Sequence, residues 1–167
     1  MKNQKVTVQL PPVSQVGMIV KDIDQVIDFY SSTFGIGPWE IREGEYRELK
    51  VRDKMYACKT KVAWAQFGPI ELELFQVKEG RSLHSEFLDK GREGVHHFGF
   101  KVTHDQKEQI IADLAQSGIN VVQAATRPNV SYAFLDTEKL GGGVFFELIE
   151  PISEDISINQ SNDRKEN

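Results

Sequence analysis

The sequence predicts an α+β fold made of two copies of one unit, in which a strand is followed by a helix and three further strands. The first observation behind this prediction is that strand-like alternation and helical periodicity occur in the same order in both halves of the chain. The second is that the ends of the halves match, since Gly68 to Phe75 aligns with Gly142 to Ile149. A glycine-containing stretch at residues 78–94 separates the halves and is interpreted as a linker.

The first half is expected to begin with a strand and an amphipathic helix. Residues 13–20 alternate between two faces, with Gln15 and Gly17 on the same face. Asp22 can cap the following helix, because its short acidic side chain accepts hydrogen bonds from the free N–H groups of the first turn. Apolar residues at three-four spacing continue to Gly35, a residue type that ends helices.

The rest of the first half is expected to form three strands, at residues 39–46, 61–67 and 70–77. Gly68-Pro69 provides a tight connection between the last two. In the final strand, Glu71 and Glu73 share a face. The charged and weakly patterned stretch at residues 47–60 is interpreted as an insertion or a mobile hairpin near the functional site.

The second half repeats this order after the linker, which contains a short helical segment at residues 83–88. In the strand that starts at Val95, alternation puts His97 on one face and His96 on the other. The periodicity then predicts a helix over about residues 105–116. Three strands are expected to follow, at residues 120–125, 131–136 and 144–150.

The predicted domain organisation is a single domain at residues 13–151, with module one at 13–79 and module two at 95–151. Residues 1–12 are polar and end in two prolines, which predicts a flexible arm. Residues 152–167 are rich in Ser, Asn, Asp and Glu, which predicts a flexible tail.

Composition excludes several classes of protein. A formal net charge of −5 and scattered basic residues argue against a nucleic-acid partner, because such proteins usually carry a basic patch. No apolar run approaches the roughly 18 residues that a membrane span needs, and the N-terminus lacks the apolar region of a secretory signal. The single cysteine, Cys58, excludes an intrachain disulfide and fits a reducing compartment. A cytoplasmic protein without a membrane or nucleic-acid partner is expected.

The repeat makes four polar positions equivalent in pairs. Gln15 matches His97 on the first strand of each half, and Glu73 matches Glu147 on the last. Two units related by a pseudo-twofold axis would bring all four side chains towards one centre. The sequence therefore predicts a shared site between the halves.

Several motifs resemble the vicinal oxygen chelate superfamily, which includes glyoxalase I, methylmalonyl-CoA epimerase, extradiol dioxygenases, and the bleomycin and fosfomycin resistance proteins. The resemblance covers about residues 13–151. Its clearest signatures are VGMIVKDID at 16–24, Phe29-Tyr30 with Phe34-Gly35, HHFGF at 96–100 and ELIEP at 147–151. The glycine-bounded linker that leads into the two histidines is most similar to the epimerases. The resemblance implies two βαβββ modules that pair into a curved mixed sheet around a central cavity, with helices on the outside, and a homodimer.

The superfamily's metal ligands fall at Gln15, Glu73, His97 and Glu147 when they are transferred to this sequence. Gln15 is the departure, because glyoxalase I and the epimerases usually have histidine there. One nitrogen and three oxygen donors form a hard ligand set for one divalent ion, with Ni, Co, Mn, Mg, Fe or Zn as candidates. Two glutamates and a histidine in an apolar cavity are also costly without a cation.

The resemblance implies a metal-dependent lyase or isomerase of the glyoxalase I or methylmalonyl-CoA epimerase type. Glu147 or Glu73 would move the proton next to a carbonyl through a metal-stabilised enediolate or enolate. The alternative is a non-catalytic small-molecule binding or resistance-type protein with a degenerate metal site, in which Gln15 hydrogen-bonds His97 or a carboxylate. An extradiol dioxygenase fits less well, because Gln15 removes one of its two histidines.

The remaining candidates have simpler interpretations. His96 is expected to be partly buried under the helices, and His84 and His104 are expected at the surface. Glu71 could replace Glu73 as a ligand or base, although an exposed position is also compatible with the pattern. The partner is expected to be a small-molecule substrate, and no run of basic residues marks it as a coenzyme A ester.

Overall fold

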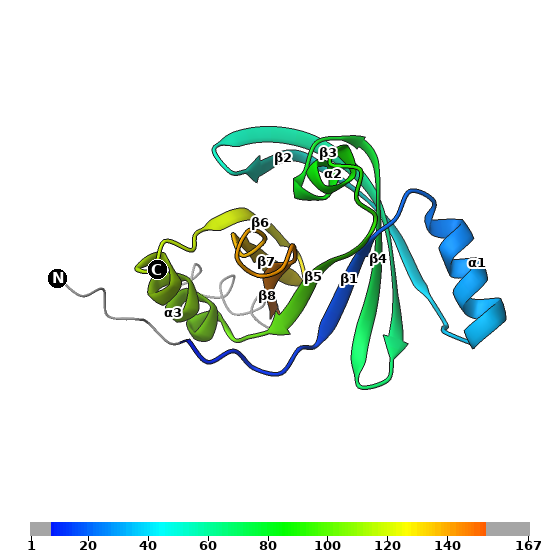
Figure 1. Cartoon of the computed structure of the whole chain (residues 1–167), viewed down its shortest axis with the longest axis horizontal. Coiled ribbons are helices and arrows are strands. Elements are labelled where there is room, and N and C mark those ends of the chain that lie inside the picture. Colours follow the sequence, from blue (N-terminus) through cyan, green and yellow to red (C-terminus); the bar gives the residue numbers. More distant parts are fainter. Residues whose placement is uncertain (1–7, 153–167) are drawn as a thin grey trace, which may run out of the picture.

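The computed structural model describes residues 8–152, which form a closed barrel of eight strands and three helices (Figure 1). The strand order around the barrel is β1-β4-β3-β2-β6-β7-β8-β5. The strands are β1 (Gln15–Ile19), β2 (Glu40–Val51), β3 (Lys54–Phe67), β4 (Ile70–Gly80), β5 (Gly94–Lys101), β6 (Val121–Arg127), β7 (Val130–Leu135) and β8 (Phe145–Pro151). The helices are α1 (Ile23–Phe34), α2 (Leu83–Asp89) and α3 (His104–Ala115).

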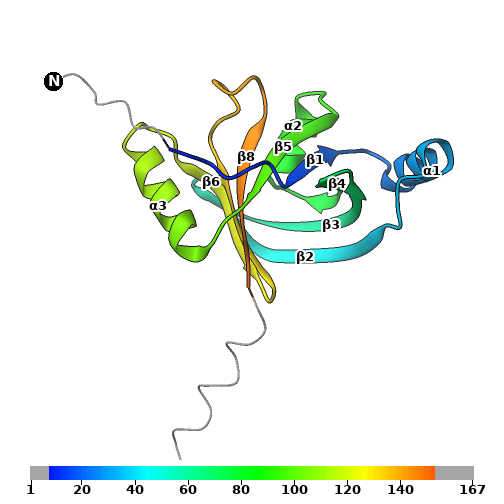
Figure 2. The same cartoon turned by 90° about the horizontal axis from the view of Figure 1, so that it is seen from below.

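The two halves of the barrel have the same internal pairing. In each, the first strand runs parallel to the last, β1 beside β4 and β5 beside β8, while the other neighbours are antiparallel. The halves join where β1 pairs with β5, with Gly17 opposite His97, and where β2 pairs with β6. Helices α1 and α3 lie outside the sheet on opposite sides (Figures 1 and 2). The predicted α+β fold with a curved mixed sheet is confirmed.

Capping interactions define both ends of α1 and the start of α3. The carboxylate of Asp22 accepts from the backbone N–H of Gln25 at 3.1 Å, and Gly35 takes a left-handed conformation with φ of 67° at the other end. For α3, the cap is a reciprocal pair between Thr103 and Gln106, each side chain accepting from the other's backbone N–H. Both helices were predicted within one or two residues.

Of the two interpretations of residues 47–60, the hairpin is correct and the insertion is wrong. β2 continues to Val51, β3 begins at Lys54, and the two form one hairpin. Leu49, Val51 and Cys58 are buried in this hairpin and pack in the cluster that contains Phe134. The sequence pattern was misleading because the β2–β3 register shifts between Tyr46 and Leu49, which breaks the alternation.

Part of the expected flexible segments lies outside the described residues, namely 1–7 and 153–167. Within the described part of the expected arm, Val8 and Leu10 pack against the apolar cluster that contains Ile110 of α3. No helix within residues 8–152 is long and apolar enough to cross a membrane.

Candidate metal and ligand site

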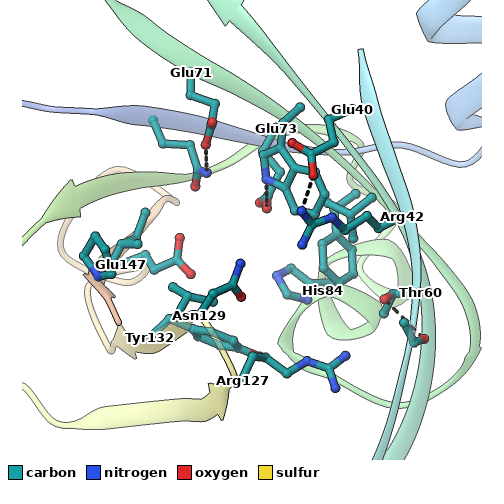
Figure 3. A pocket seen from close by; sticks show the side chains of 18 of the residues that line it. Glu40, Arg42, Thr60, Glu71, Glu73, His84, Arg127, Asn129, Tyr132 and Glu147 are labelled. Atoms are coloured by element: carbon teal, nitrogen blue, oxygen red, sulfur yellow. Dashed lines mark hydrogen bonds and ion pairs between the residues drawn. The ribbon is translucent and has the colours of Figure 1, made fainter. Parts of the chain in front are cut away.

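The four residues singled out by the repeat meet at one cavity. Gln15 lies on β1, Glu73 on β4, His97 on β5 and Glu147 on β8, which are consecutive neighbours in the barrel in the order β4-β1-β5-β8. The cavity has a volume of about 770 Å³, and Gln15, Glu73 and Glu147 line it. Figure 3 shows the Glu147 carboxylate pointing into its centre. The pseudo-twofold pairing therefore brings the side chains together as the sequence predicts.

The His97 Nε2 atom is the point on which the other three side chains converge. It lies 3.2 Å from Glu73 Oε2, 3.3 Å from Glu147 Oε2 and 3.4 Å from Gln15 Oε1. The His97 side chain is completely buried, and the two carboxylates are almost so. One nitrogen and three oxygens thus share a small volume that is shielded from solvent.

Two glycines make room for this arrangement. A Cβ atom on Gly17 would lie 1.9 Å from His97 Cε1, and one on Gly99 would lie 2.9 Å from Gln15 Cβ. Non-bonded carbon atoms do not approach this closely, so either methyl group would displace the His97 ring or a strand. Gly17 and Gly99 are therefore part of the site. The sequence analysis placed Gly17 on the same face as Gln15 but gave neither glycine a role.

Two further hydrogen bonds fix the orientation of the Gln15 amide and of the Glu73 carboxylate. The Gln15 amide N–H donates to Glu71 Oε1 at 2.8 Å, and because an ionised carboxylate only accepts, the amide oxygen must be the atom that faces His97. The Trp64 indole N–H donates to Glu73 Oε1 at 2.9 Å, which leaves Oε2 towards His97. Glu71 thus orients Gln15 from outside the four-residue set.

Burial and charge act against each other at this site. Burial opposes the charged form of His97, but the Glu147 and Glu73 carboxylates outweigh it and raise the pKa of the imidazole to about 9. Burial is also the main reason why the pKa of Glu147 is raised, although the neighbouring His97 opposes that change. The Glu147 carboxyl group can therefore hold or release a proton closer to neutral pH than an exposed glutamate can.

The donor types of this set suit a divalent ion. Adjacent ligand atoms held at about 2.0–2.2 Å from one ion lie about 2.8–3.6 Å apart, the shorter distances in octahedral and the longer ones in tetrahedral geometry. The three separations from His97 Nε2, between 3.2 and 3.4 Å, fall within that range. A mixed set of one imidazole, two carboxylates and an amide oxygen suits hard divalent ions.

Basic and aromatic side chains surround the wider part of the cavity. The Arg127 guanidinium lies 4.1 Å from the centre of the Tyr46 ring, and Arg42 pairs with Glu40. Arg42, Lys101 and Arg127 are all among the lining residues. Figure 3 shows Arg42 and Arg127 across the cavity from Glu147. A ligand would therefore meet positive charge away from the His97 centre.

His84 was predicted at the surface, and this prediction is wrong. Its side chain is 3% exposed and stacks on the Phe75 ring with centroids 3.9 Å apart. The reason is α2, whose N-terminal cap between Ser82 and Ser85 directs this short helix inwards. The signal in the sequence was the apolar spacing of Leu83 and Phe87, which marks an inward face.

His104 is at the surface as expected, and His96 is buried more completely than expected. His96 is fully buried under α2, with its ring edge-on to Phe87 at 5.1 Å. The His104 side chain is 68% exposed and contacts Glu150. Neither residue approaches the oxygens around His97 Nε2.

Comparison with known proteins identifies the fold. The model of the Glyoxalase/Bleomycin resistance protein/Dioxygenase superfamily, the vicinal oxygen chelate superfamily, matches residues 14–134. The chain belongs to this superfamily. A search of curated proteins found no match.

Solved structures of several other proteins have the same architecture. Methylmalonyl-CoA epimerase from Mycobacterium tuberculosis is 19% identical with a TM-score of 0.63, and the match covers 93% of this chain and 99% of that one. A hypothetical protein from Bacillus halodurans C-125 is 20% identical with a TM-score of 0.61, covering 86% and 96%. A Streptomyces coelicolor methylmalonyl-CoA epimerase variant in complex with 2-nitronate-propionyl-CoA is 21% identical with a TM-score of 0.61, covering 85% and 95%. At these identities the likeness establishes the fold.

Proposed function

We propose that this vicinal oxygen chelate protein is a metal-dependent lyase or isomerase that transfers a proton at a carbon next to a carbonyl group. The observation that carries the proposal is the convergence of Gln15 Oε1, Glu73 Oε2 and Glu147 Oε2 on His97 Nε2 within 3.4 Å. These four residues would hold the ion. When bound, a divalent ion supplies Lewis acidity that stabilises negative charge on a substrate oxygen.

Glu147 is the side chain best placed to carry the proton. It projects into the cavity, and its raised pKa brings the protonated and ionised forms closer in free energy. Glu73 occupies the equivalent position in the first module, but the Trp64 N–H holds one of its oxygens. Two glutamates on opposite strands could serve the two faces of a planar intermediate, which an epimerase requires.

The proposed substrate is a small carbonyl compound with a negatively charged group. Arg42 and Arg127 provide positive charge across the cavity from Glu147. The solved relatives include complexes with methylmalonyl-CoA and with a nitronate analogue of propionyl-CoA, which makes acyl thioesters the first class to test. We further propose that the protein is a homodimer and is located in the cytoplasm.

The second candidate is a binding protein without catalysis. Gln15 favours it, because an amide oxygen is a weaker ligand than the imidazole that is usual at this position. The site can also be satisfied without an ion, since a protonated His97 donates to either carboxylate. Such a protein would use the cavity to sequester a small molecule.

Metal analysis combined with ligand binding separates the two candidates. The enzyme hypothesis predicts about one divalent ion per chain in protein purified without chelator, and a lower ion content in Glu147→Gln. Glu79→Gln is the matched control, because Glu79 only forms an exposed pair with Lys59. If the wild type carries no stoichiometric ion, and acyl thioesters bind Glu147→Gln as tightly as wild type, the binding-protein candidate is correct.

A further inference from the structure

Three imidazole rings lie together on the far side of His97 from the carboxylates. His84 of α2 and His96 and His97 of β5 each bring a ring nitrogen within 4.8 Å of the other two. The ring centroids of His84 and His96 are 4.9 Å apart, and those of His96 and His97 are 5.3 Å apart. All three side chains are buried, with exposures of 3%, 0% and 0%.

Several nitrogens in this cluster have no hydrogen-bond partner among the described residues. They are both ring nitrogens of His84 and the Nε2 atom of His96. His96 Nδ1 lies 3.0 Å from His97 Nδ1. Aromatic rings enclose the cluster, since Phe75 stacks on His84 and Phe134 lies edge-on to His96 and His97. Buried polar atoms are normally satisfied by protein, water or an ion, and one ion could satisfy these nitrogens together.

We propose that His84, His96 and His97 bind one transition-metal ion through ring nitrogens. An imidazole ring binds a metal ion through a ring nitrogen that carries no proton. A cluster with three nitrogen donors suits Zn²⁺, Co²⁺, Ni²⁺ or Cu²⁺ rather than Mg²⁺ or Ca²⁺. The 3.0 Å between the Nδ1 atoms of His96 and His97 lets both contact one ion at about 2.1 Å.

This histidine site competes with the ion site of the proposed function, because it uses the opposite nitrogen of the same His97 ring. The Nδ1 atom of His97 faces His96, while its Nε2 atom faces Glu73 and Glu147. A neutral imidazole has only one bare nitrogen. With an ion on Nδ1, the Nε2–H group donates to a carboxylate, which is the usual partner of a metal-bound histidine. The same ring therefore serves either the histidine site or the carboxylate site.

X-ray absorption spectroscopy of the full-length protein loaded with Zn²⁺ or Co²⁺ distinguishes the two sites. The histidine site predicts a first shell with three imidazoles, whereas the carboxylate site of the proposed function contains one. Three imidazoles support the inference. One imidazole with several oxygens overturns it and supports the proposed function instead. No binding of either ion overturns the histidine site.

A His84→Gln variant provides an independent measurement. His84 has no contact with Glu73, Glu147 or Gln15 among the interactions of the described residues, so its loss leaves the carboxylate site in place. We expect Zn²⁺ affinity in a competition titration to fall by at least about tenfold. His104→Gln is the matched control, because His104 is exposed, and it should bind as wild type does. Folded His84→Gln with wild-type affinity would overturn the inference, and if the variant does not fold, the absorption measurement on wild type decides.

Discussion

Raising the pH should destabilise the metal-free protein over a defined window, because His97 is held in its charged form between two carboxylates. Its pKa is raised from 6.5 to about 9 in the folded protein. Below about pH 6.5 both the folded and the unfolded chain carry this proton, and the stabilisation is fully present. Between 6.5 and 9 the unfolded chain loses the proton while the folded protein keeps it, so the free energy of unfolding falls.

The size of this effect follows from the same two values. At about 1.36 kcal/mol per pKa unit, the difference between 6.5 and about 9 corresponds to a loss of about 3 kcal/mol. His84 and His96 do not contribute in this window, because burial lowers their pKa values and both are neutral above pH 6.5 in either state. They destabilise the fold only as the pH falls below that value.

Urea unfolding followed by circular dichroism, in chelator and at constant ionic strength, measures the effect between pH 6.5 and 9.5. His97→Asn is the control, since it removes the titrating ring, and its stability should be nearly constant over the window. A wild type whose free energy of unfolding does not change, or a variant that declines as steeply as wild type, would refute the assignment of the charge to His97.

Three further substitutions test other parts of the structure. Gly17→Ala places a methyl group 1.9 Å from the His97 ring and should lower the proposed activity by about 100-fold, because the ring is displaced. The NMR signals of the His97 ring would report this displacement, and unchanged signals would contradict it. Trp64→Phe removes the N–H donor to Glu73 and should lower metal affinity about 10- to 100-fold in an otherwise folded protein, and equal affinity would show that this contact does not orient the carboxylate. Leu148→Ala should cost about 2–5 kcal/mol in urea unfolding, because Leu148 is completely buried, and a loss below about 1 kcal/mol would mean that the strand repacks.

The sequence was sufficient for the parts of the fold that depend on local pattern and on the repeat. Alternation placed Gln15 and His97 on equivalent strands, and the structure pairs those strands directly. The same repeat made Glu73 equivalent to Glu147, and the Oε2 atom of each lies within 3.3 Å of His97 Nε2. Periodicity and capping chemistry also located α1, because the residues that decide its ends are its own neighbours.

Features that depend on distant contacts could not be predicted. The sequence left an insertion and a hairpin as alternatives at residues 47–60, because a register shift breaks the alternation there and because Lys50 and Val51 pair with β6, more than 70 positions along the chain. His84 was missed because the inward face of this seven-residue helix is marked only by the spacing of Leu83 and Phe87, which was not interpreted as such. The roles of Trp64 and Glu71 depend on side-chain orientation, which alternation alone does not specify.

The most direct test of the proposed function is proton exchange with solvent at the substrate carbon. Protein loaded with Co²⁺ or Mn²⁺ would be incubated in deuterium oxide with 2-methyl acyl thioesters and with hemithioacetals of 2-oxo aldehydes, and deuterium incorporation would be followed by mass spectrometry. We expect exchange with one of these classes, lowered by about 10²- to 10⁴-fold in Glu147→Gln and unchanged in Glu79→Gln. Exchange that is as fast in Glu147→Gln as in wild type, or that does not occur with any ion, would contradict the proposal.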